Sequence, residues 1–226
     1  MKSKTIIIGD THGSFPLILQ EKNLTAFHVG DFAAGFPSMN YWKLCSINDA
    51  LKNNNSHIYV NRGNHDDPAV WRQRNPKLSN LHFVDSYQAV QHGEDVYLFL
   101  GGAISVDRTE RTLGITYWKD EGFDYLDGLD ISCKNLEGVT YVISHTAPSS
   151  CWPVGFNSIC HHYAKRDRFL LDELAAERDS MSLVRDCIVK SCPKLKHWYY
   201  GHFHPQKNVT EGLFTCLAIN DYVEIG

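Results

Sequence analysis

The sequence has no closely paired cysteines, although it contains seven of them. The cysteines are scattered, odd in number and form no C-x-x-C motif: Cys45, Cys133, Cys151, Cys160, Cys187, Cys192 and Cys216. Zinc-cysteine sites usually need paired spacings, and disulfide frameworks usually need an even number of cysteines. The pattern therefore favours reduced thiols in a reducing compartment, and we expect a cytoplasmic protein.

Long apolar runs and an excess of basic residues are also missing. No stretch approaches the roughly 18 apolar residues that a membrane span requires. The short apolar segment 4–8 is followed at once by residues of catalytic type, which argues against a signal peptide. A net charge of −4 disfavours, without excluding, nucleic acid as a partner.

The order of apolar segments predicts an α/β protein, and the 226 residues fit a single domain over 1–226. In the first part of the chain, predicted strands alternate with predicted helices: 5–8, 14–22, 26–29, 38–51 and 57–60. The three short runs that follow have tight connections and predict an antiparallel group: 81–84, 87–90 and 96–100. The irregular segment 101–130 is expected to cross the surface over the site.

Helix and strand patterns return in the last third of the chain. Strands are expected at 139–143, 197–200, 213–217 and 222–225. The segment 169–190 predicts a helix in two pieces, with a break near Asp179 and Ser180. Its apolar stripe is interpreted as core packing.

Five short polar islands stand out against this background. They are Gly9-Asp10-Thr11-His12-Gly13, Gly30-Asp31, Arg62-Gly63-Asn64-His65-Asp66, Ser144-His145-Thr146 and Gly201-His202-Phe203-His204. Asp, His and Asn are residue types that bind divalent cations. Four of the islands follow an apolar run, which places them where strands end and an α/β sheet presents its loops. Together they predict a polynuclear metal site.

The spacing within the islands supports this interpretation. Asp10 and His12 stand at positions i and i+2, as do His202 and His204, so in an extended segment each pair can face one ion. Asp31 has two carboxylate oxygens and could bridge two ions.

The order GDTHG, GD, GNHD, a lone His and GHFH resembles the calcineurin-like metallophosphoesterase superfamily. Two longer strings are similar to its bacterial or phage-type branch: Gly101-Gly102-Ala103-Ile104-Ser105-Val106-Asp107 and Ser144-His145-Thr146-Ala147-Pro148. The resemblance spans Gly9 to His204. It implies a four-layer αββα sandwich of two mixed sheets flanked by helices, with a metal site at the carboxyl ends of the strands. It also implies two divalent ions, manganese first, with iron, zinc or magnesium suited as well.

The resemblance implies a role for each island residue. The first metal would be bound by Asp10, His12 and His204, the second by Asn64, His145 and His202, and Asp31 would bridge them. His65 would act as general acid or electrostatic stabiliser, and Arg62 would bind phosphate.

The function implied is hydrolysis of phosphate monoesters by attack of a metal-bridging hydroxide. A phosphorylated small molecule, a nucleotide or a phosphoprotein could be the substrate. The alternatives are a phosphodiesterase acting on a cyclic nucleotide, a dinucleoside polyphosphate or nucleic acid, and a non-catalytic metal-bound scaffold that binds a partner protein.

One motif departs from the Ser/Thr phosphatases of this superfamily, which carry G-D-x-V-D-R-G. Here Ala34 and Gly35 replace the second Asp and the Arg. The partner of His65 is therefore open, with Asp66 or Asp67 as candidates. Further substrate-binding candidates are Arg108, Arg111 and His161, for which packing or solvation is the alternative.

Overall fold

The computed structural model describes residues 4–73, 77–132, 134 and 136–225, and its strands form two mixed sheets. The first sheet has the order β11-β1-β2-β3-β4. Its strands are β1 (Lys4–Ile8), β2 (Leu24–His28), β3 (His57–Val60), β4 (Leu81–Phe83) and β11 (Tyr222–Ile225). Neighbours from β1 to β4 are parallel, and only the edge strand β11 is antiparallel to β1.

The second sheet has the order β5-β6-β7-β8-β10-β9. Its strands are β5 (Ala89–His92), β6 (Asp95–Leu100), β7 (Tyr141–Ser144), β8 (His197–Tyr200), β9 (Val209–Glu211) and β10 (Phe214–Cys216). The central strands β6, β7, β8 and β10 are parallel, while β5 and β9 pair antiparallel at the edges. Parallel strands bring their carboxyl ends to one edge, so each sheet presents successive loops there.

Side-chain alternation along the strands produces three buried clusters. In β1, Ile6 and Ile8 face the helices of the first sheet, whereas Ile7 packs between the two sheets. In β2, Phe27 also faces inward and stacks on Tyr97 of β6, with ring centroids 3.7 Å apart. Because a strand alternates its side chains with a period of two, one apolar run serves two cores.

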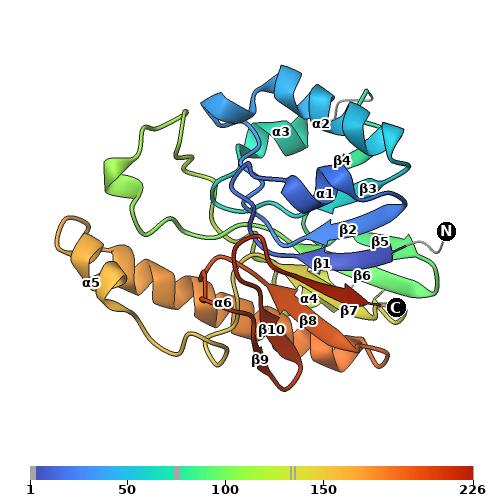
Figure 1. Cartoon of the computed structure of the whole chain (residues 1–226). Coiled ribbons are helices and arrows are strands. Elements are labelled where there is room, and N and C mark those ends of the chain that lie inside the picture. Colours follow the sequence, from blue (N-terminus) through green and yellow to red (C-terminus); the bar gives the residue numbers. More distant parts are fainter. Residues whose placement is uncertain (1–3, 74–76, 133, 135, 226) are drawn as a thin grey trace.

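Helices cover the outer face of each sheet (Figure 1). The first sheet is covered by α1 (Pro16–Gln20), α2 (Tyr41–Asn53) and α3 (Pro68–Arg72), with the 3-10 turn η1 (Pro37–Met39) before α2. The second is covered by α4 (Gly128–Ser132) and α6 (Leu170–Ser191). The remaining helices are α5 (Ser158–Ala164) and the turn η2 (Arg108–Glu110). This arrangement is compatible with the predicted sandwich.

Two local predictions are wrong. The helix predicted to break near Asp179 is continuous, because its buried face runs on across that point: Leu174 is buried before it, and Met181 and Val184 after it pack in the cluster on the second sheet. The predicted antiparallel group is also divided. β4 pairs parallel with β3 in the first sheet, since the overlooked helix α3 provides a crossover between them.

The cysteines that the structure describes are all free thiols, and Cys133 lies outside the described residues. Within the described part of the chain, no helix combines the length and the apolar character that crossing a bilayer requires.

Candidate metal centre

The polar islands meet between the carboxyl ends of the two sheets. Asp10, Asp31 and Asn64 follow β1, β2 and β3 of the first sheet, whereas His145 and His202 follow β7 and β8 of the second. Since every one of these loops begins where a parallel strand ends, residues up to 194 positions apart in sequence come into contact. The predicted placement of the islands at strand ends agrees with this arrangement.

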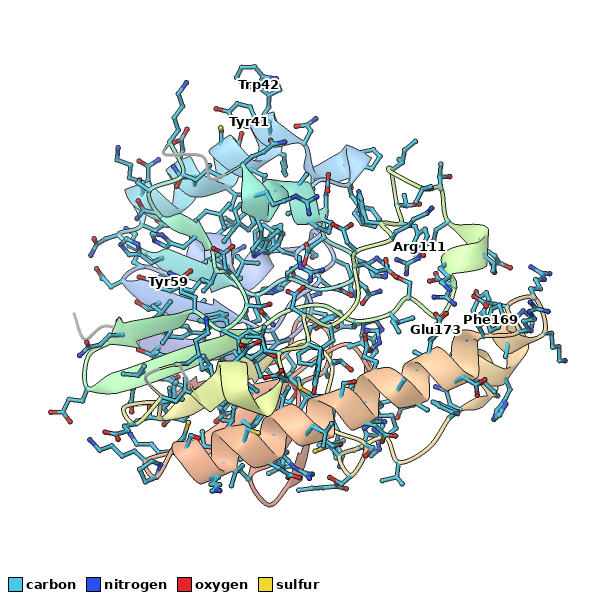
Figure 2. The ribbon with its side chains drawn as sticks, turned by 180° about the vertical axis from the view of Figure 1, so that it is seen from behind. Tyr41, Trp42, Tyr59, Arg111, Phe169 and Glu173 are labelled. Carbon is cyan, nitrogen blue, oxygen red and sulfur yellow. The ribbon has the colours of Figure 1, made fainter. Side chains whose placement is uncertain are left out.

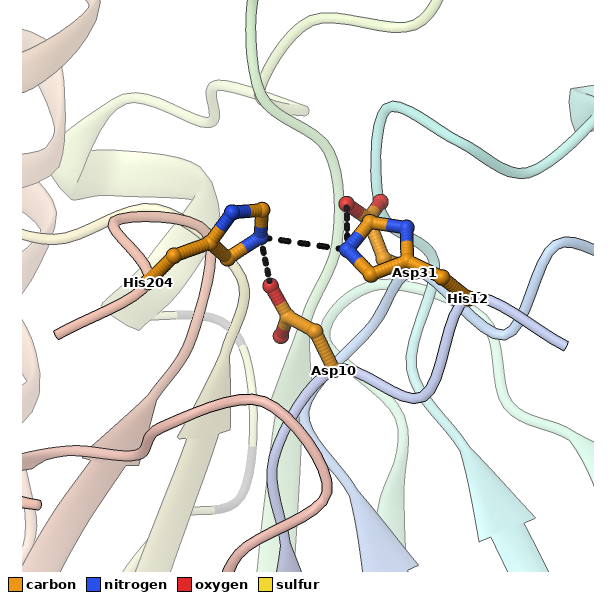
Figure 3. Close-up of side chains that lie close together, drawn as sticks. All are labelled: Asp10, His12, Asp31 and His204. Carbon is orange, nitrogen blue, oxygen red and sulfur yellow. Dashed lines mark hydrogen bonds and ion pairs between the residues drawn. The ribbon is translucent and has the colours of Figure 1, made fainter. Parts of the chain in front are cut away.

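Four side chains form the first group: Asp10, His12, Asp31 and His204. Each offers one ligand atom, and these atoms all lie within 4.8 Å of one another. His204 Nε2 lies 3.0 Å from Asp10 Oδ2 and 3.1 Å from His12 Nε2 (Figure 3). His12 Nε2 is 3.7 Å from Asp31 Oδ2. The four are the first metal set that the resemblance implies.

A second group lies on the other side of Asp31. His145 Nε2 is 3.0 Å from Asn64 Oδ1 and 3.2 Å from Asp31 Oδ1. The His202 ring packs edge-on against His145, with centroids 5.0 Å apart. The two oxygens of Asp31 thus face different groups, as a bridging carboxylate would.

Two buried carboxylate oxygens in this centre have no hydrogen-bond partner among the described residues. They are Asp10 Oδ1 and Asp31 Oδ2, on side chains that are at most 1% exposed. A buried charged oxygen left unpaired is costly, so such atoms call for a compensating partner. A cation would supply it, and the carboxylate and imidazole donors suit a divalent metal.

The backbone at the centre is held in an uncommon conformation. His12, Asp31, His202 and His204 have φ of 45°, 58°, 68° and 46°, in the left-handed region that L residues rarely adopt. Such conformations cost about 1–3 kcal/mol each and persist where the surroundings enforce them, typically at functional sites. Here they turn four side chains of the two groups toward one another.

The motif glycines make room for the carboxylates. A Cβ at Gly63 would overlap Asp31 Oδ1, and a Cβ at Gly201 would overlap Asp10 Oδ1. The glycine of one island thus packs directly on the carboxylate of another. This explains why the islands carry glycine beside their polar residues.

Replacing Gly201 by alanine should damage the centre. The added methyl must displace Asp10, so we expect a loss of stability of about 1–3 kcal/mol and weaker metal binding. Gly138→Ala is the matched control, because a Cβ there meets nothing closer than Val96 Cγ2 at 4.0 Å. Chemical denaturation measures the stability of both variants, and metal titration measures their metal affinity. Equal stability and equal metal affinity in the two variants would contradict the packing of Gly201 on Asp10.

Charge coupling in the centre favours ionised carboxylates beside a protonated histidine. Burial raises the pKa of Asp10 and Asp31, but the surrounding histidines, His145 foremost, together outweigh burial and hold both pKa values below the usual value. Burial lowers the pKa of His145, yet the carboxylates of Asp31 and Asp10 raise it to about 9. Burial lowers the pKa of His202 to about 3. The metal-free centre therefore holds a proton where a cation would bind.

Metal binding should consequently release a proton. A histidine ligand must be neutral, whereas His145 in the metal-free protein is protonated below about pH 9. Apparent metal affinity should therefore rise by up to roughly tenfold per pH unit between pH 7 and 9. Calorimetry in buffers of different ionisation enthalpy counts the protons, and His145→Gln should release about one fewer. Affinity independent of pH, without proton release, would contradict this assignment.

His65 lies at the edge of the first group and is held by neighbours that the sequence did not reveal. Its ring stacks on Phe36 at 5.5 Å and lies edge-on to His12 at 4.8 Å. The Arg111 guanidinium donates to its Nε2, which must therefore accept. Burial, opposed by Asp31 and aided by Arg111, lowers the pKa of His65 to about 4. In the metal-free protein His65 is thus neutral at pH 7, which disfavours its role as a protonated acid.

Neither candidate partner of His65 contacts its ring. The buried Asp66 carboxylate accepts from the backbone N–H of Gly63, at 2.8 Å, and of Ala34, at 2.9 Å. It therefore ties two ligand-bearing loops together. Asp67 caps α3 by accepting from the backbone N–H of Ala69. Both acids support the backbone around the centre instead of orienting His65.

Arg62 is not placed to bind phosphate. Its side chain is buried and donates to the carbonyls of Asp120, Glu121 and Gly122 and to Asp124 Oδ2, at 2.8–3.2 Å. These bonds anchor the segment 120–124 to the end of β3 and turn the guanidinium away from the metal groups. The expectation that Arg62 clamps a phosphate does not agree with this position.

The three other substrate candidates differ in their placement. Arg111 lines the pocket at the centre, and Asp107 pairs with its Nε at 2.6 Å. Arg108 instead pairs with Asp167 and Glu173, connecting its loop to the start of α6. His161 is exposed on α5, and its neighbours Cys160 and Tyr163 line the pocket in its place. Figure 2 shows Arg111 on the loop that faces the start of α6, where Glu173 is labelled.

Neither the protein-family models nor the curated proteins include a match to this chain.

Proposed function

We propose that this chain is a metal-dependent phosphoesterase of the calcineurin-like type that hydrolyses phosphate monoesters. One observation supports the proposal above the others. The buried Asp31 carboxylate stands between two groups of O and N ligands, with one oxygen unpaired, beside a pocket lined by Arg111 and His65. Two metal sites that share a carboxylate, with a cation beside them, suit phosphoryl transfer.

The geometry of the two groups supports the ligand sets that the resemblance implies. One ion would be held by Asp10, His12 and His204. The other ion would be held by Asn64, His145 and His202, and Asp31 would bind both ions. The fold that we propose is a four-layer αββα sandwich whose metal site lies at the carboxyl ends of the strands. When bound, two divalent ions would activate a water and neutralise phosphate oxygens. Manganese is the first candidate, and the O and N donors also suit iron, zinc or magnesium.

We assign to Arg111 the phosphate-binding role that the resemblance implied for Arg62. It lies in the pocket, next to His65 of the ligand-bearing loop, and its partner Asp107 orients the guanidinium from one side. A guanidinium presents parallel N–H donors that match two phosphate oxygens. A phosphate in the pocket would compete with His65 for Arg111, which frees the His65 ring to contact the ester oxygen.

Hydrolysis of an aryl phosphate tests this function. The protein supplied with Mn²⁺ should release inorganic phosphate from p-nitrophenyl phosphate, lose this activity with a chelator and regain it with Mn²⁺. The monoester should be cleaved faster than bis(p-nitrophenyl) phosphate; the reverse order would favour the phosphodiesterase alternative. Full metal occupancy without turnover of either ester would support a non-catalytic scaffold instead.

A further inference from the structure

The pocket at the centre extends well beyond the space that a phosphate needs. Its volume is about 660 Å³, and only one end is formed by the metal-ligand residues. The other end is lined by aromatic and aliphatic side chains from the loop before α5 and from α5 itself: Trp152, Phe156, Ile159 and Tyr163. Phe203, from the loop after β8, lies next to the ligand residues, with its ring centroid 5.0 Å from that of His202. The pocket is therefore polar at one end and apolar at the other.

The charged side chains that line this pocket outside the metal groups are already paired. Arg111 pairs with Asp107, and Glu177 accepts from the Phe123 backbone N–H at 3.1 Å. Arg178 donates to backbone carbonyls, including that of Cys151 at 2.7 Å. No lysine is among the described residues that line the pocket. A second charged group on a substrate would thus find no uncommitted partner there.

Arg178 also makes the apolar end rigid. Besides Cys151, its guanidinium donates to the carbonyls of Ala147, at 3.1 Å, and Pro148, at 2.6 Å, and it stacks over Phe203 at 4.9 Å. These contacts fix the loop that carries Trp152 relative to α6. Ligand sites are usually preformed, with apolar walls and a few placed polar groups, and this pocket has both.

We infer that the apolar end binds the leaving group of the substrate, and that this group is a neutral, flat aromatic ring system. The inference rests on the proposed function, since the phosphate must sit at the metal end. Aliphatic side chains such as Ile159 and Leu174 line the pocket too, but its lining also holds four aromatic ones, Trp152, Phe156, Tyr163 and Phe203, and aromatic rings stack well on flat partners. The exposed Phe156 and Ile159, 36% and 55% accessible, form the outer part of this wall.

Matched alkyl phosphates test the inference. 2-Naphthylmethyl phosphate and ethyl phosphate both release an alkoxide leaving group of similar basicity, so they differ mainly in apolar area. The aromatic ester should have a kcat/KM at least about tenfold higher, since contacts in an apolar pocket discriminate by roughly 10–200-fold. Hexyl phosphate separates flat from flexible apolar groups and should fall between the two. Equal values for naphthylmethyl and ethyl phosphate, or a preference for hexyl phosphate, would overturn the inference.

Variants of exposed residues test where on the protein the preference for the aromatic ester arises. Phe156→Ser combined with Ile159→Ser should reduce the ratio of kcat/KM for the aromatic ester to kcat/KM for ethyl phosphate by at least about tenfold. Val154→Ser is the matched control, because Val154 lies in the same loop and is 78% exposed but does not line the pocket. If the control lowers the preference as much as the double variant, the subsite is wrongly placed.

A binding measurement separates this inference from the proposed function. 2-Naphthylmethylphosphonate cannot be hydrolysed, and calorimetry should show it binding the Mn²⁺-loaded protein at least about tenfold more tightly than ethylphosphonate. The double variant should abolish that difference. Tight binding without turnover of any ester would reject the enzyme and retain the aromatic subsite. Turnover of ethyl phosphate without selective binding would reject the subsite alone.

Discussion

Asparagine in place of Asp31 should abolish phosphate ester hydrolysis and reduce the bound metal by at least one ion per chain. The side chain keeps its shape but loses the charge that faces both ligand groups. Removing a residue that only supports a metal ligand typically costs 10–100-fold in activity or affinity, so losing the shared ligand should cost more than about 100-fold. Phosphate release and elemental analysis of the purified variant measure the two effects.

The matched control for this variant is Asp49→Asn, on the exposed face of α2. It makes the same chemical change far from the strand ends and should leave activity and metal content as in the wild type. Circular dichroism of both variants separates loss of the centre from loss of the fold. A folded Asp31→Asn protein with full metal content and full activity would contradict the bridging role.

Replacing Arg111 by glutamine should produce the second large loss of catalytic activity. It retains a donor but removes the charge that we assign to the phosphate oxygens. Loss of one preorganised donor to transition-state charge costs about 10²–10³-fold in kcat, and we expect a loss of this size with metal content unchanged. Steady-state kinetics and elemental analysis of the same preparation measure both quantities.

Two control variants accompany this experiment. Arg166 is exposed and pairs with Glu110, the residue before Arg111, so Arg166→Gln removes a guanidinium near the site but outside the pocket. It should keep wild-type kinetics. Arg62→Gln should lower stability, because its four bonds to the segment 120–124 are lost, while the metal ligands stay in place. The phosphate-binding role would return to Arg62 if Arg62→Gln lost catalytic activity without any loss of stability while Arg111→Gln kept its catalytic activity.

The meeting of the polar islands could be predicted from sequence because the ends of strands can be recognised in it. An apolar run such as 5–8 marks a buried parallel strand, and the polar island after it must lie at the carboxyl edge. The seven predicted ligands accordingly meet between the two sheets. The left-handed backbone at Asp31 and His204 had no sequence signal beyond the neighbouring glycines, because it is enforced by tertiary packing.

The surroundings of the centre were less predictable because their positions depend on contacts between distant segments. Arg62 follows Asn61, whose side chain donates to the carbonyls of Val29 and Leu100 inside the core. Arg62 therefore leaves the strand in another direction, toward 120–124. Arg111 comes from a segment without periodicity, so neither its contact with His65 nor the role of Asp107 could be derived from local pattern.

The most direct test of the central claim is a crystal structure of the protein grown with Mn²⁺ and phosphate, analysed by anomalous diffraction. The account predicts two manganese peaks, one beside Asp10, His12 and His204 and one beside Asn64, His145 and His202. Asp31 should lie between the peaks, which should be roughly 3.5–4 Å apart, as in other two-metal sites. The phosphate should contact Arg111. The absence of manganese between these residues, or peaks confined to other parts of the molecule, would contradict the account.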